Sequence, residues 1–310
     1  MNLPPEFISN IQNTFREDGQ AFLKALPDSI AEASAKWGLT DIQPAPNLSY
    51  NFVAFAKRGR DWVVLKMGVP NREMKSEMAV LRLFNGEGAC QLLECDEEKY
   101  WMLLERLNPG VMLAAMEDDE EATHIAAEVM KKIWRSGLDM ADEHRLLDQR
   151  GKEFIRLTDW FDGLKKLRLM FNGGTGPLNE KLVERVERSV ADFFVENHRP
   201  VLMHGDFHHF NILSSERGWL VIDPKGVIGP AGYEVGPLLM NPWGELLNGT
   251  NYRLITKRRI DILHEHLGFE RERIREWGLA HAVLSAWWGI EDNTGWEYSL
   301  AFAEMLADLK

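Results

Sequence analysis

The sequence predicts an α+β fold in two lobes, a small lobe built on an antiparallel sheet and a larger, mainly helical lobe. Three observations support this prediction. Strand-like runs joined by short turns dominate between about residue 48 and residue 105, and helical spacing of apolar residues dominates after residue 108. A short strand–turn–strand unit then interrupts the helices at 201–223. We therefore expect residues 1–107 to form an N-terminal lobe and residues 108–310 to form a C-terminal lobe.

Composition narrows the range of partners. The chain has 310 residues, of which 45% are hydrophobic and 27% are charged, as is usual for a globular protein with lobes large enough to bury their own cores. Its formal net charge is −12, from 36 Lys and Arg against 48 Asp and Glu. This balance disfavours nucleic acid and anionic membranes as partners, and it suits a cationic small molecule.

The cysteine content and the search for targeting signals in the sequence indicate the cellular compartment of the protein. Cys90 and Cys95 are too few for a disulfide framework, and they flank an apolar pair, which favours free thiols over a metal site. No apolar run approaches the length of a membrane span, and residues 1–6 lack the basic-then-apolar pattern of a signal peptide. We therefore expect a cytoplasmic protein.

The start of the chain predicts leading helices followed by a β-hairpin. Apolar residues recur at helical spacing over residues 4–38, and Gly38 ends the pattern. A proline-rich connection at 44–46 then leads into two strands at 48–56 and 62–67, which are joined by a polar turn.

Lys66 lies near the end of the second of these strands, among apolar residues. Such a lysine usually extends its charged end from a sheet edge, but it can also hold phosphate groups. A helix is predicted at 72–84, and it carries Glu73 and Glu77 on one face because they are four residues apart. Either glutamate could reach Lys66.

Beyond this helix, residues 100–105 predict a strand that leads into a Pro-Gly turn. The glycine-rich run at 173–177 is interpreted as a flexible loop, because no lysine follows it and no strand precedes it. Further helices are predicted at 122–136, 153–171 and 178–197, and over most of the last seventy residues.

The stretch 201–223 brings polar residues together. Asp206 follows a short apolar strand, Asn211 comes five residues later, and Asp223 ends a predicted hairpin. A hairpin returns its two ends to the same place, so these three side chains can converge. Two carboxylates and an amide oxygen are hard ligands of the type that suits magnesium carrying nucleotide phosphates.

Two motifs in this stretch carry a resemblance to a known family. They are His204–Leu213, H-G-D-F-H-H-F-N-I-L, and Trp219–Gly226, W-L-V-I-D-P-K-G. They resemble the aminoglycoside phosphotransferases, and most of all the streptomycin/hydroxyurea phosphotransferase branch, with similarity over roughly residues 45–290. The resemblance implies a bilobal protein-kinase-like fold. It also implies ATP-dependent transfer of a phosphoryl group to a hydroxyl of a small molecule, with an aminoglycoside such as streptomycin as the first candidate.

Other functions remain open. Hydroxyurea or an unrelated small metabolite is the alternative acceptor, and a kinase-shaped module that binds nucleotide without turnover is the alternative from another class. The presence of Lys66, Asp206, Asn211 and Asp223 argues against the silent module. A protein kinase is disfavoured because no Ala-Pro-Glu follows Asp223.

The resemblance also implies roles for individual residues. Asp206 would accept the proton of the acceptor hydroxyl, while Asn211 and Asp223 would hold Mg²⁺. Lys66 would orient the ATP phosphates, and Glu77 would position Lys66. His204 is expected to pack and hydrogen-bond behind the loop. A zinc site at the adjacent histidines 208 and 209 is disfavoured, because neighbouring side chains diverge.

Nucleotide and acceptor contacts are predicted with fewer signals. No G-x-G-x-x-G is present, and Ser49, Tyr50 and Asn51 take the place of the phosphate-covering loop. Backbone groups of Glu105 and Leu107 would contact the adenine edge. Candidate carboxylates for a cationic acceptor are Glu234, Glu291 and Asp292, although for each one taken singly an ordinary surface acid is the favoured interpretation. Pro230 stands where the branch usually carries an acidic residue, which weakens acceptor contacts from that loop.

Overall fold

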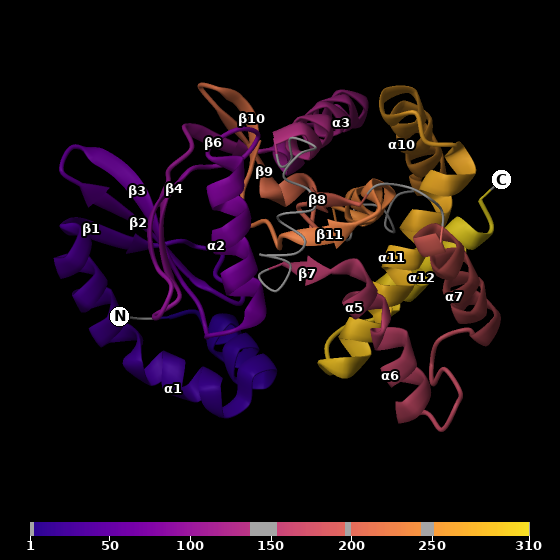
Figure 1. Ribbon diagram of the computed structural model, residues 1–310, viewed down its shortest axis with the longest axis horizontal. Helices are drawn as coiled ribbons and strands as arrows, with labels where there is room; N and C mark the ends of the chain where they lie inside the picture. Colours follow the sequence, from indigo (N-terminus) through magenta and orange to yellow (C-terminus); the bar gives the residue numbers. More distant parts are fainter. Residues whose placement is uncertain (1–2, 137–153, 196–199, 243–250, 310) are drawn as a thin grey trace.

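A computed structural model describes residues 3–136, 154–195, 200–242 and 251–309. Within these ranges the protein has a sheet-containing lobe and a mainly helical lobe (Figure 1). The small lobe contains a five-stranded antiparallel sheet in the order β1-β2-β3-β5-β4. Its strands are β1 (Leu39–Pro44), β2 (Phe52–Arg58), β3 (Asp61–Met67), β4 (Leu92–Asp96) and β5 (Trp101–Glu105).

The central hairpin is confirmed with shifted ends. β2 and β3 pair from Phe52 opposite Met67 to Arg58 opposite Asp61, so residues 48–51 precede the sheet as a turn and do not extend it. β1 and β4 were not predicted. Both are edge strands with mixed exposure, so they lack the clean alternation of a strand that has one buried face.

Two helices lie against this sheet. α1 (Pro5–Trp37) covers one face, where its Phe7, Ile11 and Leu26 join a core with the inward residues of β2 and β3. α2 (Arg72–Phe84) lies on the other side, and its buried residues belong to a second core that continues into the large lobe. α2 therefore packs between the two lobes, as Figure 1 shows.

The ends of α2 follow the predicted signals. The Asn71 side chain accepts a hydrogen bond from the N–H of Met74, which caps the first turn. Asn85 ends the helix in the left-handed conformation, with φ of 45°. These bounds agree with the predicted helix at 72–84.

The large lobe is mainly helical. It contains α3 (Asp119–Ser136), α5 (Leu157–Phe161), α6 (Gly163–Met170), α7 (Glu180–Val195), α8 (Val235–Met240), α10 (Tyr252–Leu267), α11 (Arg271–Glu291) and α12 (Glu297–Ala307). α11 is the central helix, with Trp277 and Trp287 almost fully buried. The helix predicted at 153–171 is wrong at its start, because Ile155–Arg156 form the short strand β7 before α5 begins.

Two small sheets support the loops of this lobe. One has the order β10-β9-β6, and the other has the order β7-β11-β8. The strands are β6 (Pro109–Met112), β8 (Val201–Met203), β9 (Ile212–Ser215), β10 (Gly218–Val221) and β11 (Val227–Gly229). The β9–β10 hairpin was predicted, and β6 was not.

Backbone hydrogen bonds join the small lobe to the β9–β10 hairpin. The N–H of Cys90 donates to the Val221 carbonyl at 2.8 Å, and the N–H of Val221 donates to the Gly88 carbonyl at 2.9 Å. The segment after α2 is therefore attached to the strand that leads to Asp223. No helix in the described ranges is long and apolar enough to cross a membrane.

Candidate active site

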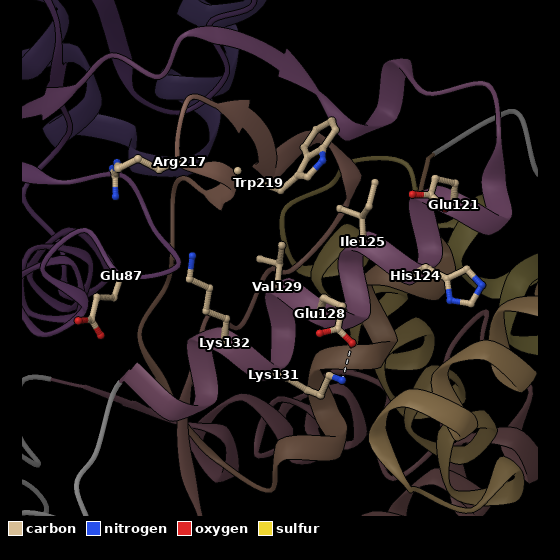
Figure 2. Close-up of a pocket in the computed structure, with 11 residues that line it drawn as sticks. Glu87, Glu121, His124, Ile125, Glu128, Val129, Lys131, Lys132, Arg217 and Trp219 are labelled. Atoms are coloured by element: carbon tan, nitrogen blue, oxygen red, sulfur yellow. Dashed lines mark ion pairs between the residues drawn. The ribbon is translucent and has the colours of Figure 1, made fainter.

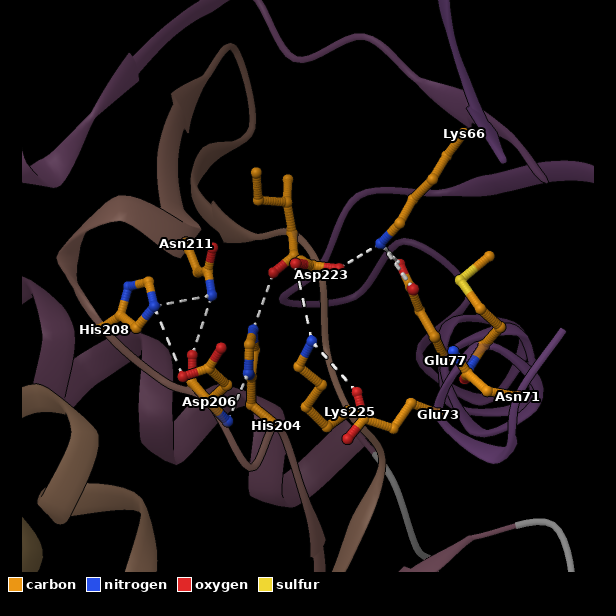
Figure 3. A network of polar contacts seen from close by, with 12 residues as sticks. Lys66, Asn71, Glu73, Glu77, His204, Asp206, His208, Asn211, Asp223 and Lys225 are labelled. Carbon is orange, nitrogen blue, oxygen red and sulfur yellow. Dashed lines mark hydrogen bonds and ion pairs between the residues drawn. The ribbon is translucent and has the colours of Figure 1, made fainter. Parts of the chain in front are cut away.

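Lys66 occupies the face of β3 that points away from α1. Val63, Leu65 and Met67 face the α1 core, so strand alternation turns Lys66 towards α2. Its Nζ lies 2.6 Å from both carboxylate oxygens of Glu77 and also pairs with Asp223 (Figure 3). Of the two glutamates that the spacing allowed, the structure therefore selects Glu77.

Burial and charge set the protonation of this cluster. Burial raises the pKa of Glu77 to about 7, although the Lys66 ammonium opposes this. Burial would also raise the pKa of Asp223, but Lys225 and Lys66 outweigh it and hold this pKa far below its usual range. Asp223 is therefore ionised at neutral pH.

A tight loop carries the central motif. Gly205 has φ of +87°, and a Cβ on it would lie 2.3 Å from Cγ2 of Val227, so only glycine fits here. The buried His204 ring donates from Nε2 to the Ile222 carbonyl at 2.8 Å, and its Nδ1 accepts the Asp206 N–H at 3.1 Å. Burial lowers the pKa of His204 to about 4, so the ring is neutral as these bonds require. His204 packs behind the loop as predicted.

The Glu234 side chain accepts hydrogen bonds from the backbone of the same loop. It is fully buried, and its two oxygens accept the N–H groups of His204 at 3.0 Å and Gly205 at 2.7 Å. Burial raises the pKa of Glu234 to about 8, although these two N–H donors oppose the shift. We therefore revise the expectation that Glu234 contacts the acceptor, because both of its oxygens are used inside the protein.

Asp206 lines a cavity of about 840 Å³ between the lobes. Its backbone carbonyl accepts a hydrogen bond from Nδ2 of Asn211 at 3.0 Å, and its Oδ1 lies 3.5 Å from Nε2 of His208. Burial alone would raise the pKa of Asp206, but His208 and Lys225 outweigh it and keep this pKa below its usual range. An ionised carboxylate therefore faces the cavity.

Lys225 adds a positive charge to the floor of this cavity. Its Nζ lies 4.0 Å from Oδ2 of Asp223 and 3.7 Å from Oε2 of Glu73 (Figure 3). Asp223 raises the pKa of Lys225, against the effect of burial. The predicted site did not include Lys225, and it included Glu73 only as an alternative partner of Lys66. The signal was present, because Lys225 belongs to the second family motif.

Other walls of the cavity come from both lobes. They include Thr14, Phe15, Tyr50, Asn51, Trp160, Phe210, Asn241, His281, Ser285, Trp288 and Asp292. Tyr50, Asn51 and Asp292 were predicted as contact residues, whereas Ser49 is not among the lining residues. Glu291 pairs with Lys166 at 3.3 Å and does not line the cavity either.

The predicted adenine-contact residues lie apart from this cavity. The N–H of Glu105 donates to the Gln91 carbonyl, and its side chain accepts the Gln91 N–H and pairs with Arg217. Leu107 is buried. Their contact with adenine stays a prediction.

The donor set of Asn211 and Asp223 suits a hard divalent cation. Nδ2 of Asn211 is engaged by the Asp206 carbonyl, which leaves the amide oxygen for a ligand, and Asp223 is ionised. Magnesium commonly takes one or two protein oxygens and completes its shell with water and phosphate. In the described ranges, histidines 208 and 209 among them, no three His, Cys, Asp or Glu side chains lie close enough together to hold one metal ion.

A second cavity, of about 920 Å³, lies between α3 and the β9–β10 hairpin (Figure 2). Its lining includes His124, Lys132, Arg217 and Trp219, and none of the candidate residues Lys66, Glu77, Asp206, Asn211 and Asp223. Cavity volume therefore does not choose between the two, whereas the converging charged groups favour the smaller cavity as the candidate active site.

Comparison with known proteins shows the family to which the chain belongs. Residues 40–293 match the family described as aminoglycoside/hydroxyurea antibiotic resistance kinases, which covers most of the chain. The chain belongs to this family. It is therefore an enzyme, a phosphotransferase that acts on small molecules.

Relatives within the family span nearly the whole chain. A streptomycin 6-kinase from Streptomyces glaucescens is 28% identical, over 95% of this chain and 92% of the relative. A streptomycin 6-kinase from Streptomyces griseus is also 28% identical, with 94% and 92% covered. A hydroxyurea phosphotransferase from Kitasatospora aureofaciens is 29% identical, with 89% and 76% covered.

Solved structures confirm the fold. A choline kinase from Streptococcus pneumoniae aligns with a TM-score of 0.62 at 13% identity, covering 91% of this chain and 97% of that one. An aminoglycoside phosphotransferase aligns with a TM-score of 0.60 at 13% identity, covering 92% and 98%. This kinase therefore has the bilobal protein-kinase-like fold that its sequence predicted.

Proposed function

We propose that this kinase transfers the γ-phosphate of ATP to a hydroxyl group of a cationic aminoglycoside, with streptomycin as the first acceptor to test. The observation that carries the proposal is the convergence of Lys66, Asp206 and Asp223 beside a cavity large enough for an oligosaccharide-like acceptor. The two streptomycin 6-kinases among the relatives support this choice of acceptor.

The nucleotide would lie on the Lys66 side of Asp206. Lys66 would move from its pairing with Asp223 to the ATP phosphates, while Glu77 keeps its ammonium in place. Asn211 and Asp223 would hold Mg²⁺, whose positive charge would neutralise the charge that develops on the phosphates. Related aminoglycoside phosphotransferase structures contain ADP or AMP-PNP, which supports the use of an adenine nucleotide.

On the acceptor side, Asp206 and Lys225 would assist the transfer of the phosphoryl group. Asp206 would hold the acceptor hydroxyl by a hydrogen bond and take its proton as the bond to phosphorus forms. Lys225 would place its ammonium beside the transferred group, where the negative charge of a loose transition state is stabilised. Phosphoryl transfer depends mainly on such positioning and charge, with little covalent work for the protein.

Recognition of a cationic acceptor would come from carboxylates on the cavity wall. Asp206, Glu73 and Asp292 all line it, together with the rings of Trp160 and Trp288, whose centroids are 5.3 Å apart. Carboxylates attract the amino or guanidino groups of an aminoglycoside, and aromatic rings pack against the faces of its sugar rings.

A screen of ADP release tests the proposal. The purified enzyme is incubated with ATP, Mg²⁺ and each of a panel: streptomycin, other aminoglycosides, hydroxyurea and small polyols. Turnover with streptomycin or another aminoglycoside is the expected result, and the phosphorylated product is identified by mass spectrometry. Hydroxyurea is the second candidate because one relative is a hydroxyurea phosphotransferase. ATP binding without turnover on any acceptor would indicate a silent nucleotide-binding module instead.

A further inference from the structure

α1 is sharply bent near its middle. Arg16 has φ of 51° and ψ of −119°, which divides the helix into a first segment, residues 5–15, and a second segment, residues 17–37. The bend brings the two segments into backbone contact, because a Cβ added to Gly19 would lie 2.3 Å from the Ile11 carbonyl oxygen. Glycine at position 19 therefore permits the close approach.

The first segment is anchored to the small lobe. Phe7 and Ile11 are fully buried in the core that α1 shares with the sheet, so this segment has a fixed place. Phe15, at the end of the segment, is partly buried against the same core. Figure 1 shows the indigo start of α1 beside the beginning of α2.

The end of the first segment reaches the cavity of the active site. Thr14 and Phe15 line this cavity together with Asn71 and Arg72 from the start of α2, and with Trp288 from the large lobe. The cavity also contains Asp206, the candidate base. Of the candidates on the nucleotide side, Tyr50, Asn51 and Glu77 also line this cavity, whereas Lys66, Asn211 and Asp223 do not. Thr14 and Phe15 therefore share the cavity with the candidate base and with Trp288 of the large lobe.

Thr14 and Phe15 lie outside the part of the chain that matches the family. The match begins at residue 40, so the whole of α1 lies before it. The two motifs that identify the family place the catalytic and metal residues, and they say nothing about α1.

We propose that the first segment of α1 is part of the acceptor site and that Phe15 determines which acceptors bind. This rests on the proposed function, because it assumes that an acceptor with several rings enters the cavity. The Phe15 ring would cover one face of an acceptor ring from the small-lobe side, opposite Trp288, and exclude water from it. The Thr14 hydroxyl would hydrogen-bond a polar group at the edge of the same ring.

The matched pair Phe15→Leu and Phe22→Leu tests this assignment. Phe22 is on the same helix and packs against the same small-lobe core, but it does not line the cavity. Leucine keeps most of the packing volume in both variants. Thr14→Ala is a third variant, which removes only the hydroxyl. Each protein is compared with wild type for melting temperature, acceptor kcat/KM, KM for ATP, and ATP hydrolysis without acceptor.

We expect Phe15→Leu to lower kcat/KM for streptomycin about tenfold, mainly through KM, because a ring-on-ring contact is lost. Its KM for ATP and its acceptor-free ATP hydrolysis should stay at the wild-type values. Phe22→Leu should show acceptor kinetics close to wild type at a similar melting temperature. Equal acceptor kinetics for the two leucine variants, or an equal rise in KM for ATP, would overturn the proposal.

The same experiment separates this proposal from the proposed function. If wild type phosphorylates only a non-aminoglycoside acceptor, the proposed function is wrong, and the two leucine variants are then compared on that acceptor. If wild type acts on no acceptor in the panel, both proposals fail together. If wild type accepts streptomycin and Phe15→Leu does too with unchanged KM, only the role of Phe15 is wrong.

Discussion

Lys66 is a buried side chain that we expect to affect both the stability of the protein and the proposed reaction. It is about 5% exposed and lies between the carboxylates of Glu77 and Asp223. Because it neutralises Glu77 in a low-dielectric setting, its removal leaves that carboxylate without its cation, whereas Asp223 keeps Lys225 nearby. Stability and activity are therefore coupled at this residue.

Lys66→Met should lower the free energy of unfolding by about 3 kcal/mol, the usual cost of leaving one member of a buried ion pair alone. The double variant Lys66→Met/Glu77→Gln should recover most of that loss, because Glu77 no longer carries a charge that needs a partner. Neither variant should turn over ATP. Urea unfolding together with an ADP-release assay checks both statements, and a fully stable Lys66→Met protein would contradict the buried pairing.

Asp206 offers a cleaner separation of chemistry from stability. Its structural bonds use backbone atoms, the N–H to His204 and the carbonyl to Asn211, and they survive a change of side chain. Asp206→Asn should therefore keep its melting temperature and its affinity for ATP. It should lose about 10²- to 10⁴-fold in kcat, because an amide cannot accept the hydroxyl proton.

The role of Asp206 is tested by measuring the melting temperature, the ATP affinity and the kcat of this single variant. A folded, ATP-binding Asp206→Asn enzyme with near-normal kcat would place the base elsewhere. A parallel loss of stability and kcat would instead indicate that the Asp206 side chain only stabilises the loop.

Among the secondary-structure elements, α1 has the predicted extent but not the predicted straight course. The periodicity predicted helical residues 4–38, and the structure has them, but with a bend at Arg16 that periodicity does not show. The backbone angles of Arg16 match the first central position of a type II′ turn, where glycine is preferred. A side chain with a Cβ is disfavoured there.

Arg16→Gly should therefore raise the free energy of unfolding by about 1 kcal/mol, the balance of relieved backbone strain and greater freedom of the unfolded chain. Arg16→Ala is the matched control, since it removes the same charge and keeps the Cβ. Thermal unfolding of both variants tests the bend. Equal melting temperatures for the glycine and alanine variants would mean that the backbone at this position is not strained.

At the scale of the whole molecule, the two lobes share the site. Lys66 and Glu77 come from the small lobe, whereas Asp206, Asn211 and Asp223 come from the large lobe. The β9–β10 hairpin is hydrogen-bonded to the segment after α2, which links the lobes directly behind Asp223. A ligand that contacts both lobes should therefore stabilise the entire protein.

We expect ATP with Mg²⁺ at about 100 times its Kd to raise the free energy of unfolding by about 2.7 kcal/mol. Chelation of Mg²⁺ should remove much of this gain. In Asp223→Asn the gain from ATP should not depend on Mg²⁺, because a charged metal ligand is lost. Melting temperatures with and without ATP, Mg²⁺ and EDTA are compared within each variant. Equal Mg²⁺ dependence in wild type and Asp223→Asn would remove Asp223 from the metal site.

Local features of the chain were readable from the sequence because they depend on residues close together along it. The β2–β3 hairpin, α2 with its Asn71 cap, and the β9–β10 hairpin follow from alternation, helical spacing and turn residues within a few positions. The family followed from two short motifs, and with it came the bilobal fold. The candidate residues Lys66, Asp206, Asn211 and Asp223 came from the same motifs and spacing.

Contacts between distant parts of the chain were decided only by the tertiary structure. Lys66 and Asp223 are 157 residues apart, and which glutamate pairs with Lys66 depends on how α2 lies on the sheet. Glu234 was a candidate acceptor contact or else an ordinary surface acid, yet it is buried behind the loop of the central motif. Phe15 reaches the cavity because α1 bends at a position that apolar spacing does not mark. Sequence patterns report which face of an element is apolar, whereas packing between elements decides what each polar side chain meets.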